Sequence, residues 1–369
     1  MRRNHLRASL AFATLAMVGA CADNVTAPGA ASQLQTPSFR QLDMEPAVIK
    51  LGYFSKSPVI TMGLKHGFFA AEGITLDTAQ TASSPAIFKA LQTGGRDVIL
   101  TQIDNVFNYR YNASNPNGST FEPVAFIGTD WGNGAALVTR KGITSVEELR
   151  GKVLAVDSPN SGFAFVLYGI MRAHGLEKDV DYTVIVPKKA DGTQDSGTPA
   201  RYTRLQAGEF DATILNAGFQ FRAEAAGYPI LGQIKDAADP FMGGAGVTRR
   251  DWLDNNQDLA IRFIRAYVAA ENYVLDPANK DEIVAQLTKE SANIAVVGQK
   301  TYELLLRQGE GLTPDASIDT KALLGTAQLR DSFGGFDEPQ NLDYLTSPAS
   351  GMYDLSYWRM ATLANGWKE

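Results

Sequence analysis

The sequence has few residues for thiol or imidazole chemistry, with one cysteine and three histidines among 369 residues. A single cysteine excludes an intrachain disulfide and any site built from several thiolates. His5 lies in the basic N-terminal stretch, while His66 and His174 are far apart and have no cysteine nearby. We therefore predict a protein without a metal or other cofactor.

Positive charge is also in deficit, since 34 Lys and Arg oppose 40 Asp and Glu and give a formal net charge of −6. An acidic body disfavours general binding to nucleic acid or to an anionic membrane surface, although a local pocket for an anion is compatible with it. The apolar runs are too short for a transmembrane helix in the mature chain. The composition, 44% hydrophobic with 34 Gly, is that of a soluble globular protein long enough for two domains.

The N-terminus is predicted to be a targeting segment. Arg2, Arg3 and Arg7 precede a short apolar run at 8–17, as in a signal peptide. Val18-Gly19-Ala20-Cys21 resembles the bacterial lipobox, and the resemblance implies a signal peptide at 1–20 and lipidation of Cys21. A plain secretory signal cleaved nearby is the alternative. Ala22 in place of Asp favours outer-membrane anchoring in a Gram-negative cell. The stretch 21–45 has no apolar periodicity and is interpreted as a flexible tether.

A repeated pattern of strand, serine loop and helix organises the folded part. The apolar strand predicted at 48–53 is followed by a Ser-Lys-Ser-Pro loop, and similar units follow at 74–95 and 152–175. Serine before a helix caps it, and proline suits the first helical position. Helix N-termini then direct free N–H groups toward the loops, where open α/β sheets place ligands.

From Asp239 the sequence pattern changes from strand, loop and helix units to amphipathic helices, which are predicted at 255–275, 280–290, 296–306 and 319–333. The aromatic residues of the last stretch are interpreted as packing on the body.

Several segments in order resemble one group of periplasmic binding proteins, which serves ABC importers of nitrate, taurine, aliphatic sulfonates and thiamine-precursor pyrimidines. They are Gly67-Phe68-Phe69 with Glu72-Gly73-Ile74, Ala90-Leu91-Gln92-Thr93-Gly94-Gly95-Arg96-Asp97-Val98, and Ile143-Thr144-Ser145 with Glu148-Leu149-Arg150-Gly151-Lys152-Val153. The likeness covers about 46–232.

This resemblance implies an α/β, two-lobed fold of the type II periplasmic-binding-protein kind with a ligand cleft between the lobes. Lobe one would comprise 46–138 plus 239–369, and lobe two 139–238, with strand-like crossings at 135–139 and 241–247. It further implies a monomer at the cell envelope, anchored in the membrane through Cys21, that binds a small-molecule ligand and meets the ABC permease of its importer.

The loops at the predicted strand ends supply the candidate ligand residues. Serines there can offer a hydroxyl or cap a helix, asparagines offer an amide edge, and Asp104 is either a ligand group or a cap. Trp131, in a polar glycine-rich loop, is either a stacking surface or part of the core. The candidates are Phe54, Ser55, Ser83, Ser84, Asp104, Asn105, Trp131, Asn160, Ser161, Gly162, Phe163, Asn216 and Phe219.

Few bases and several rings in these loops predict a small, flat or partly apolar organic ligand with one polar or anionic end. We expect binding without catalysis. The alternatives are an enzyme similar to the thiamine-pyrimidine synthases, which needs a histidine and cysteine cluster that is missing here, and an envelope lipoprotein that passes its ligand to a sensor or another carrier.

Overall fold

The computed structural model describes residues 45–81 and 83–363, which belong to one compact unit. The predicted signal peptide, Cys21 and the tether up to residue 44 lie outside the described residues. Within the described ranges, no helix combines the length and the apolar character needed to cross a bilayer.

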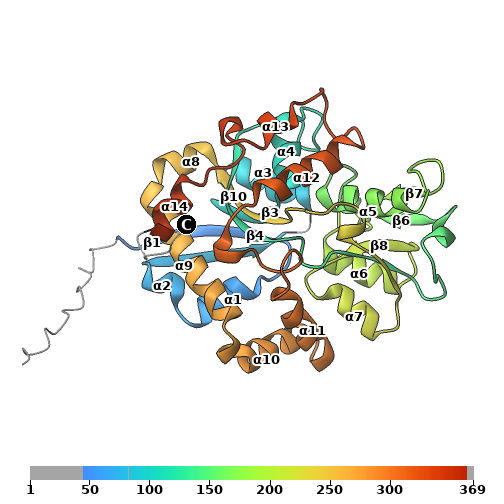
Figure 1. Cartoon of the computed structure of the whole chain (residues 1–369), viewed down its shortest axis with the longest axis horizontal. Helices are drawn as coiled ribbons and strands as arrows, with labels where there is room; N and C mark the ends of the chain where they lie inside the picture. Colours follow the sequence, from blue (N-terminus) through green and yellow to red (C-terminus); the bar gives the residue numbers. More distant parts are fainter. Residues whose placement is uncertain (1–44, 82, 364–369) are drawn as a thin grey trace, which may run out of the picture. The chain divides into compact units, whose positions relative to one another are not determined.

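The first of two five-stranded sheets has the order β2-β1-β3-β10-β4 (Figure 1). Its strands β1, β2 and β3 are parallel, and β10 runs antiparallel to both β3 and β4. Strand β4 lies at the edge of this sheet, yet it is buried from Pro123 to Thr129, because isolated bridges from Ala125 to Tyr353 and from Asp130 to Leu312 cover its free side. The bounds are β1 Ala47–Tyr53, β2 Ile74–Gln80, β3 Val98–Gln102, β4 Pro123–Asp130 and β10 Gly244–Arg249.

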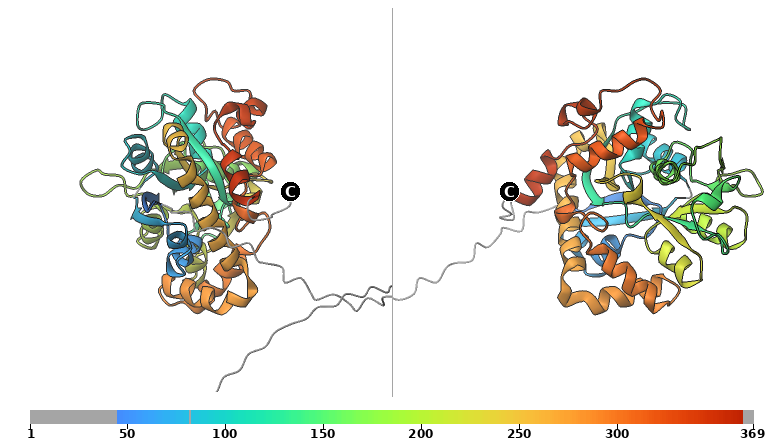
Figure 2. Two further views of the ribbon diagram at one scale, coloured as in Figure 1. Left: turned by 90° about the vertical axis from the view of Figure 1, so that its left-hand side faces the viewer. Right: turned by 45° about the vertical axis from the view of Figure 1, so that its right-hand side comes forward.

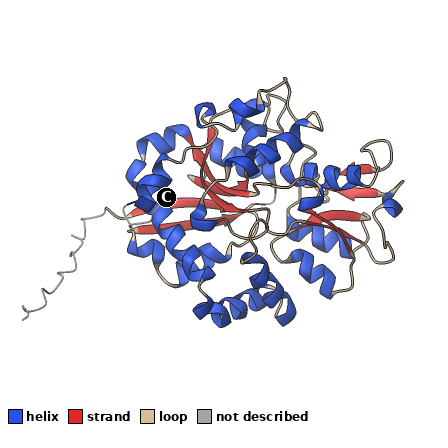
Figure 3. Cartoon of the chain, in the orientation of Figure 1, coloured by secondary structure: helices blue, strands red, loops and turns tan. Residues whose placement is uncertain are grey.

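The second sheet has the order β7-β6-β8-β5-β9. Strand β6 is parallel to β7 and β8, while β5 is antiparallel to β8 and β9. Two mixed sheets flanked by helices confirm the predicted α/β class (Figure 3). The bounds are β5 Ala136–Thr139, β6 Val153–Ala155, β7 Thr183–Ile185, β8 Ala212–Leu215 and β9 Ile230–Gln233.

Serine caps begin three of the helices that face the strand ends. The hydroxyls of Ser57, Ser83 and Ser161 accept the backbone N–H groups of Ile60, Ala86 and Ala164. Capping was expected at Ser84, but Ser83 holds that position and Ser84 is the first residue of its helix. The helices of this half are α1 Pro58–Lys65, α2 Phe68–Ala71, α3 Ser84–Gln92, α4 Asp104–Tyr111, α5 Gly162–Ala173, α6 Thr198–Gln206 and α7 Phe219–Ala225.

The C-terminal part is helical, as predicted, and its long helix α9 packs on the first sheet. Phe263, Ala266, Tyr267 and Ala270 are buried at helical spacing in the same core cluster as Leu51. Helices α10 and α11 form a pair at the lower edge of the views in Figures 1 and 2. The bounds are α8 Arg250–Asn255, α9 Gln257–Leu275, α10 Lys280–Glu290, α11 Ala295–Leu305, α12 Thr320–Asp331, α13 Leu342–Leu345 and α14 Ser356–Leu363.

Two chain segments join the sheets, one after β4 and one before β10, and they touch through backbone. A Cβ added to Gly243 would lie 2.0 Å from the backbone nitrogen of Gly132, so the contact needs glycine. Gly132 itself has a φ of 103°, a backbone conformation that other residues rarely adopt. Strands β5 and β10 lie within the sheets, so only residue 135 and residues 241–243 of the crossings predicted at 135–139 and 241–247 belong to the joining segments.

Candidate ligand-binding site

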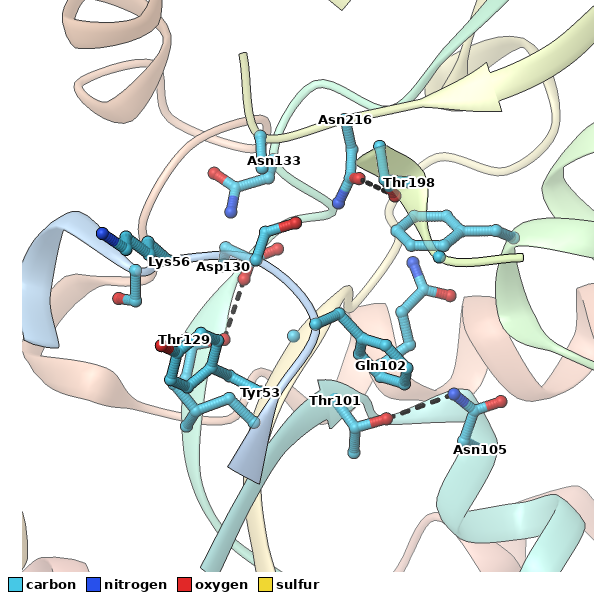
Figure 4. A pocket seen from close by; sticks show the side chains of 18 of the residues that line it. Tyr53, Lys56, Thr101, Gln102, Asn105, Thr129, Asp130, Asn133, Thr198 and Asn216 are labelled. Atoms are coloured by element: carbon cyan, nitrogen blue, oxygen red, sulfur yellow. Dashed lines mark hydrogen bonds between the residues drawn. The ribbon is translucent and has the colours of Figure 1, made fainter. Parts of the chain in front are cut away.

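Strand ends and helix N-termini from both sheets line one cavity (Figure 4). Its volume, taken as the space that the centre of a water-sized sphere can reach, is about 110 Å³. One water needs roughly 10–15 Å³ on this measure, so the space suits a ligand of about ten non-hydrogen atoms. The side chains that bound it most closely from the two sheets include Tyr53, Phe54, Thr101, Gln102, Asn105, Thr129, Asp130, Asn133, Asp157, Phe163, Thr198, Arg201 and Asn216.

Unpaired amide groups face this cavity from the end of β3 and the start of α4. Gln102 is only 7% exposed, and neither of its amide atoms has a hydrogen-bond partner among the described residues. Asn105 donates to the Thr101 hydroxyl at 3.2 Å, which leaves its buried carbonyl oxygen unpaired. Buried polar atoms are rarely left unpaired, so these three atoms indicate that a ligand completes the hydrogen bonding.

A second amide approaches from the other sheet. The side-chain oxygen of Asn216, which follows β8, accepts the hydroxyl proton of Thr198 at 2.9 Å. Its NH2 group is thereby directed away from Thr198, and Figure 4 shows Asn216 and Asn133 pointing into the cavity with Asp130. The two sheets therefore both present hydrogen-bonding groups to one space.

Asp157, at the end of β6, joins the two sides of the cavity. Its carboxylate accepts the hydroxyl of Ser84 at 2.7 Å and that of Ser161 on its own side. Ser84 begins α3 and Ser161 caps α5, so one carboxylate serves two helix N-termini. An anion at this position is stabilised by the partial positive charge of both helices.

Arg201 of α6 is buried in the cavity lining and is paired with no carboxylate within the part of the chain that the structure describes. Its three nitrogens donate to the Thr213 hydroxyl and to the carbonyls of Ser196 and Ile214. Burial lowers the pKa of the Arg201 guanidinium, and the negative charge of Asp157 opposes that fall. The guanidinium thus holds the loop before α6 in place and has little hydrogen-bonding capacity left for a ligand.

Asp130, at the end of β4, carries a second carboxylate in the lining. It accepts the Thr129 hydroxyl and the Gly132 N–H, each at 2.8 Å, and it forms no ion pair among the described residues. Burial raises the pKa of the Asp130 carboxyl, and these neutral donors only partly oppose the rise. The base nearest the opening, Lys56, is exposed.

A wider cavity of about 320 Å³, on the same measure, adjoins the first and shares Ser55, Lys56 and Asn133 with it. Helices α10 and α11 border it through residues such as Leu287 and Leu305. We call this wider cavity, bordered by α10 and α11, the antechamber of the smaller cavity.

The structure brings seven of the thirteen predicted ligand residues to the smaller cavity. These are Phe54, Ser55, Ser84, Asn105, Ser161, Phe163 and Asn216. Phe219 lies instead in the antechamber, where it stacks near the guanidinium of Arg222.

The other five predicted residues do not line the smaller cavity, each for a structural reason. Ser83 caps α3. Asp104 is 1% exposed and forms a two-point ion pair with Arg330. The Asn160 backbone accepts a hydrogen bond from the same arginine at 2.7 Å. Trp131 is partly buried and packs against the core cluster that contains Phe107 and Met242, which favours its interpretation as a packing residue. Gly162 lacks a side chain, and a Cβ there would lie 2.0 Å from the Gln102 amide oxygen.

Several lining residues were missed by the sequence reasoning. Gln102 and Asp157 directly follow predicted strands, and Asp130 lies two residues after another, so the rule that chose Asn105 and Asn216 would also have found them. Arg201 lies within a helix and carries no such sign, since only the fold shows that its guanidinium reaches the strand ends.

Comparison with known proteins places the chain in a family. The profile of the NMT1-like family matches residues 43–288. The chain belongs to the NMT1-like family. A comparison with curated protein sequences finds no match.

The NMT1-like chain also shares its fold with solved structures. The nitrate-binding protein NrtA of Synechocystis PCC 6803 superposes with a TM-score of 0.69 and 12% identity, over 86% of this chain and 88% of that one. The alkanesulfonate-binding protein SsuA of Xanthomonas axonopodis pv. citri, solved with MOPS, superposes with a TM-score of 0.61 and 16% identity, over 80% of this chain and 96% of that one. The desulfurization enzyme DSZB superposes with a TM-score of 0.52 and 15% identity, over 86% of this chain and 99% of that one. These likenesses establish the two-lobed type II binding-protein fold, which carries both binding proteins and an enzyme.

Proposed function

We propose that this protein is the extracytoplasmic solute-binding lipoprotein of an ABC importer, which captures a small organic molecule by closing two lobes around it. The observation that carries the proposal is the cavity between the sheets, which is lined by strand ends from both and contains unpaired amide atoms. Such a site binds by hydrogen bonding and ring contact, as small-molecule sites commonly do. The permease of the importer is the implied partner, and the binding protein acts as a monomer.

In this proposal each sheet is the centre of one lobe, and the predicted division near 138 and 239 approximates the two joining segments. The lobes meet through the bond from Ser84 to Asp157 and through the bond from Arg330 to the Asn160 carbonyl. Both contacts would break if the lobes opened, so they support closure of the lobes as part of the proposal.

Binding without catalysis is part of the proposal. Among the described residues no group of histidine, cysteine and acidic side chains could hold a metal ion. His66 and His174 lie near the surface and pair with Glu282 and Glu147, away from the cavity.

Thermal denaturation of the chain from residue 22 onward, with a library of small organic acids, amines and heterocycles, tests this function. A ligand at 100 times its dissociation constant stabilises by about 2.7 kcal/mol, which is about 4 °C for a body of this size. Mass spectrometry should recover the bound ligand unchanged. Conversion of the ligand to a product would replace the binding function with the enzymatic alternative.

The lipid anchor is tested on the full chain in a bacterial host. We expect the mature protein in the membrane fraction with a lipid-modified Cys21, and the Cys21→Ser variant in the soluble fraction. A soluble parent protein with an unmodified N-terminus would contradict the anchor and leave the solute-binding function untouched.

A further inference from the structure

The place where this cavity would hold an anionic ligand group is filled by the chain itself. The N-termini of α3 and α5 meet at the cavity, and free N–H groups at helix N-termini attract anions. Asp157, which is 6% exposed, accepts the hydroxyls of both Ser84 and Ser161 there. A ligand oxyanion at this point would have to displace or approach a buried carboxylate of the same sign.

The remaining charges of the lining also disfavour an anion. Arg201 already donates from all three of its nitrogens to protein oxygens. Lys56 is exposed at the border with the antechamber. Asp130 accepts only neutral donors and has no ion-pair partner among the described residues. Arg201 and Asp157 carry opposite charges that favour each other, so Asp130 is the lining carboxylate left without a counter-charge among the described residues, and a cation is the ligand group that would supply it.

The unpaired amide atoms agree with this charge balance. The Gln102 amide and the Asn105 carbonyl together present two acceptors and one NH2 donor group. A ligand rich in N–H groups satisfies two acceptors, whereas a sulfonate or nitrate brings acceptors only. Tyr53, Phe54 and Phe163 add aromatic surface for a flat ring or for a cation.

We propose that the cavity selects a flat, cationic nitrogen compound of about ten non-hydrogen atoms, such as an aryl amidine or an aryl guanidine, and rejects oxyanions. Asp157 takes the place of a ligand anion at the two helix N-termini. Asp130 receives the N–H groups of the ligand. This inference rests on the proposed solute-binding function and adds the charge of the solute.

Three probes of nearly equal size and different charge test it: benzamidine, benzamide and benzenesulfonate. Each is titrated calorimetrically into the chain from residue 22 onward. Charge-assisted hydrogen bonds exceed neutral ones by enough to make benzamidine bind at least about tenfold more tightly than benzamide. Benzenesulfonate should give no binding heat.

Variants then assign the selectivity to residues. Asp130→Asn should weaken benzamidine about tenfold or more and abolish its advantage over benzamide. Asp157→Asn should bring benzenesulfonate into measurable range, because the helix N-termini lose their resident anion. Asp343→Asn is the matched control, since it makes the same change at an exposed carboxylate of α13 that lines neither cavity, and it should leave the order of the three probes unchanged. Circular dichroism confirms that each variant is folded.

The ranking on the unmodified protein decides the inference even where a variant fails to fold. Benzenesulfonate binding as tightly as benzamidine would overturn the charge selectivity while upholding the solute-binding function. Absence of benzamidine binding would also overturn the charge selectivity. The solute-binding function is then tested separately by thermal denaturation with the library of small organic molecules. An unchanged preference for benzamidine in folded Asp130→Asn would remove the role given to Asp130.

Discussion

The buried ion pair between Asp104 and Arg330 gives the sharpest test of how this fold is held together. Arg330 is 0% exposed and meets the carboxylate at two points, with its Nε and Nη2 atoms at 2.9 and 2.7 Å from the two oxygens. The same guanidinium donates to the carbonyls of Gly335 and Asn160. Arg330→Met keeps much of the volume and leaves one carboxylate buried without its cation.

Removing one partner of a buried pair costs about 3–5 kcal/mol, because the other charge is left uncompensated. With about 2.1 cal/mol/K of unfolding entropy per residue and roughly 320 described residues, this loss lowers the melting temperature by about 4–8 °C. The double variant Asp104→Leu with Arg330→Met removes both charges, so it should recover most of the loss. Urea unfolding of the parent, the single variant and the double variant measures these differences.

The pH dependence of the same variant supplies an independent check. Burial raises the pKa of the Asp104 carboxyl, and Arg330 opposes that rise. In Arg330→Met only the raising influences remain, so Asp104 takes up a proton more readily and the penalty should shrink as the pH falls from about 8 to about 5. A single variant as stable as the parent, or a double variant as unstable as the single, would refute this account of the pair.

Three further predictions follow from contacts described above. Gly162→Ala should weaken any ligand of the cavity at least about tenfold by pushing the Gln102 amide aside, whereas circular dichroism should be unchanged. Trp131→Ala should cost about 1–3 kcal/mol in urea unfolding with little change in affinity, because the partly buried Trp131 side chain packs against the core. Asn216→Ala should instead weaken binding about three- to tenfold. Hydrogen bonds from Lys65, Tyr273 and His66 lower the pKa of Glu282 to about 2. The stabilisation by Glu282 is therefore present above about pH 4.5 and is lost as the pH falls toward 2. Glu282→Gln should flatten that part of the plot of urea midpoint against pH.

Much of the fold was predictable because local chemistry and tertiary structure agree along this chain. The Ser-Pro loops mark helix starts by capping, and the apolar spacing around Phe263 marks the buried face of α9. Long amphipathic helices carry their own periodicity, so their limits were predicted to within a few residues. The joining segments were placed slightly late, because only strand pairing decides where a sheet begins.

The candidate site was predictable in part, and the failures have a common cause. Sequence shows which polar residues follow a strand but not which of them find partners within the protein. Asp104 follows β3 as Asn105 does, yet Arg330, more than two hundred residues later, occupies its carboxylate. Such long-range pairing leaves no local mark in the sequence.

The same reasoning changes the meaning of the helix N-termini. The serine loops before α3 and α5 were expected to direct helix N-termini toward a ligand, and that N-terminal geometry is present. A carboxylate from the chain, Asp157, occupies the point where they meet. The charge that such a cleft accepts therefore depends on which residue ends β6, because an acid there satisfies the helices internally and leaves Asp130 to select the ligand. One substitution at Asp157 should then alter ligand charge preference without altering the fold.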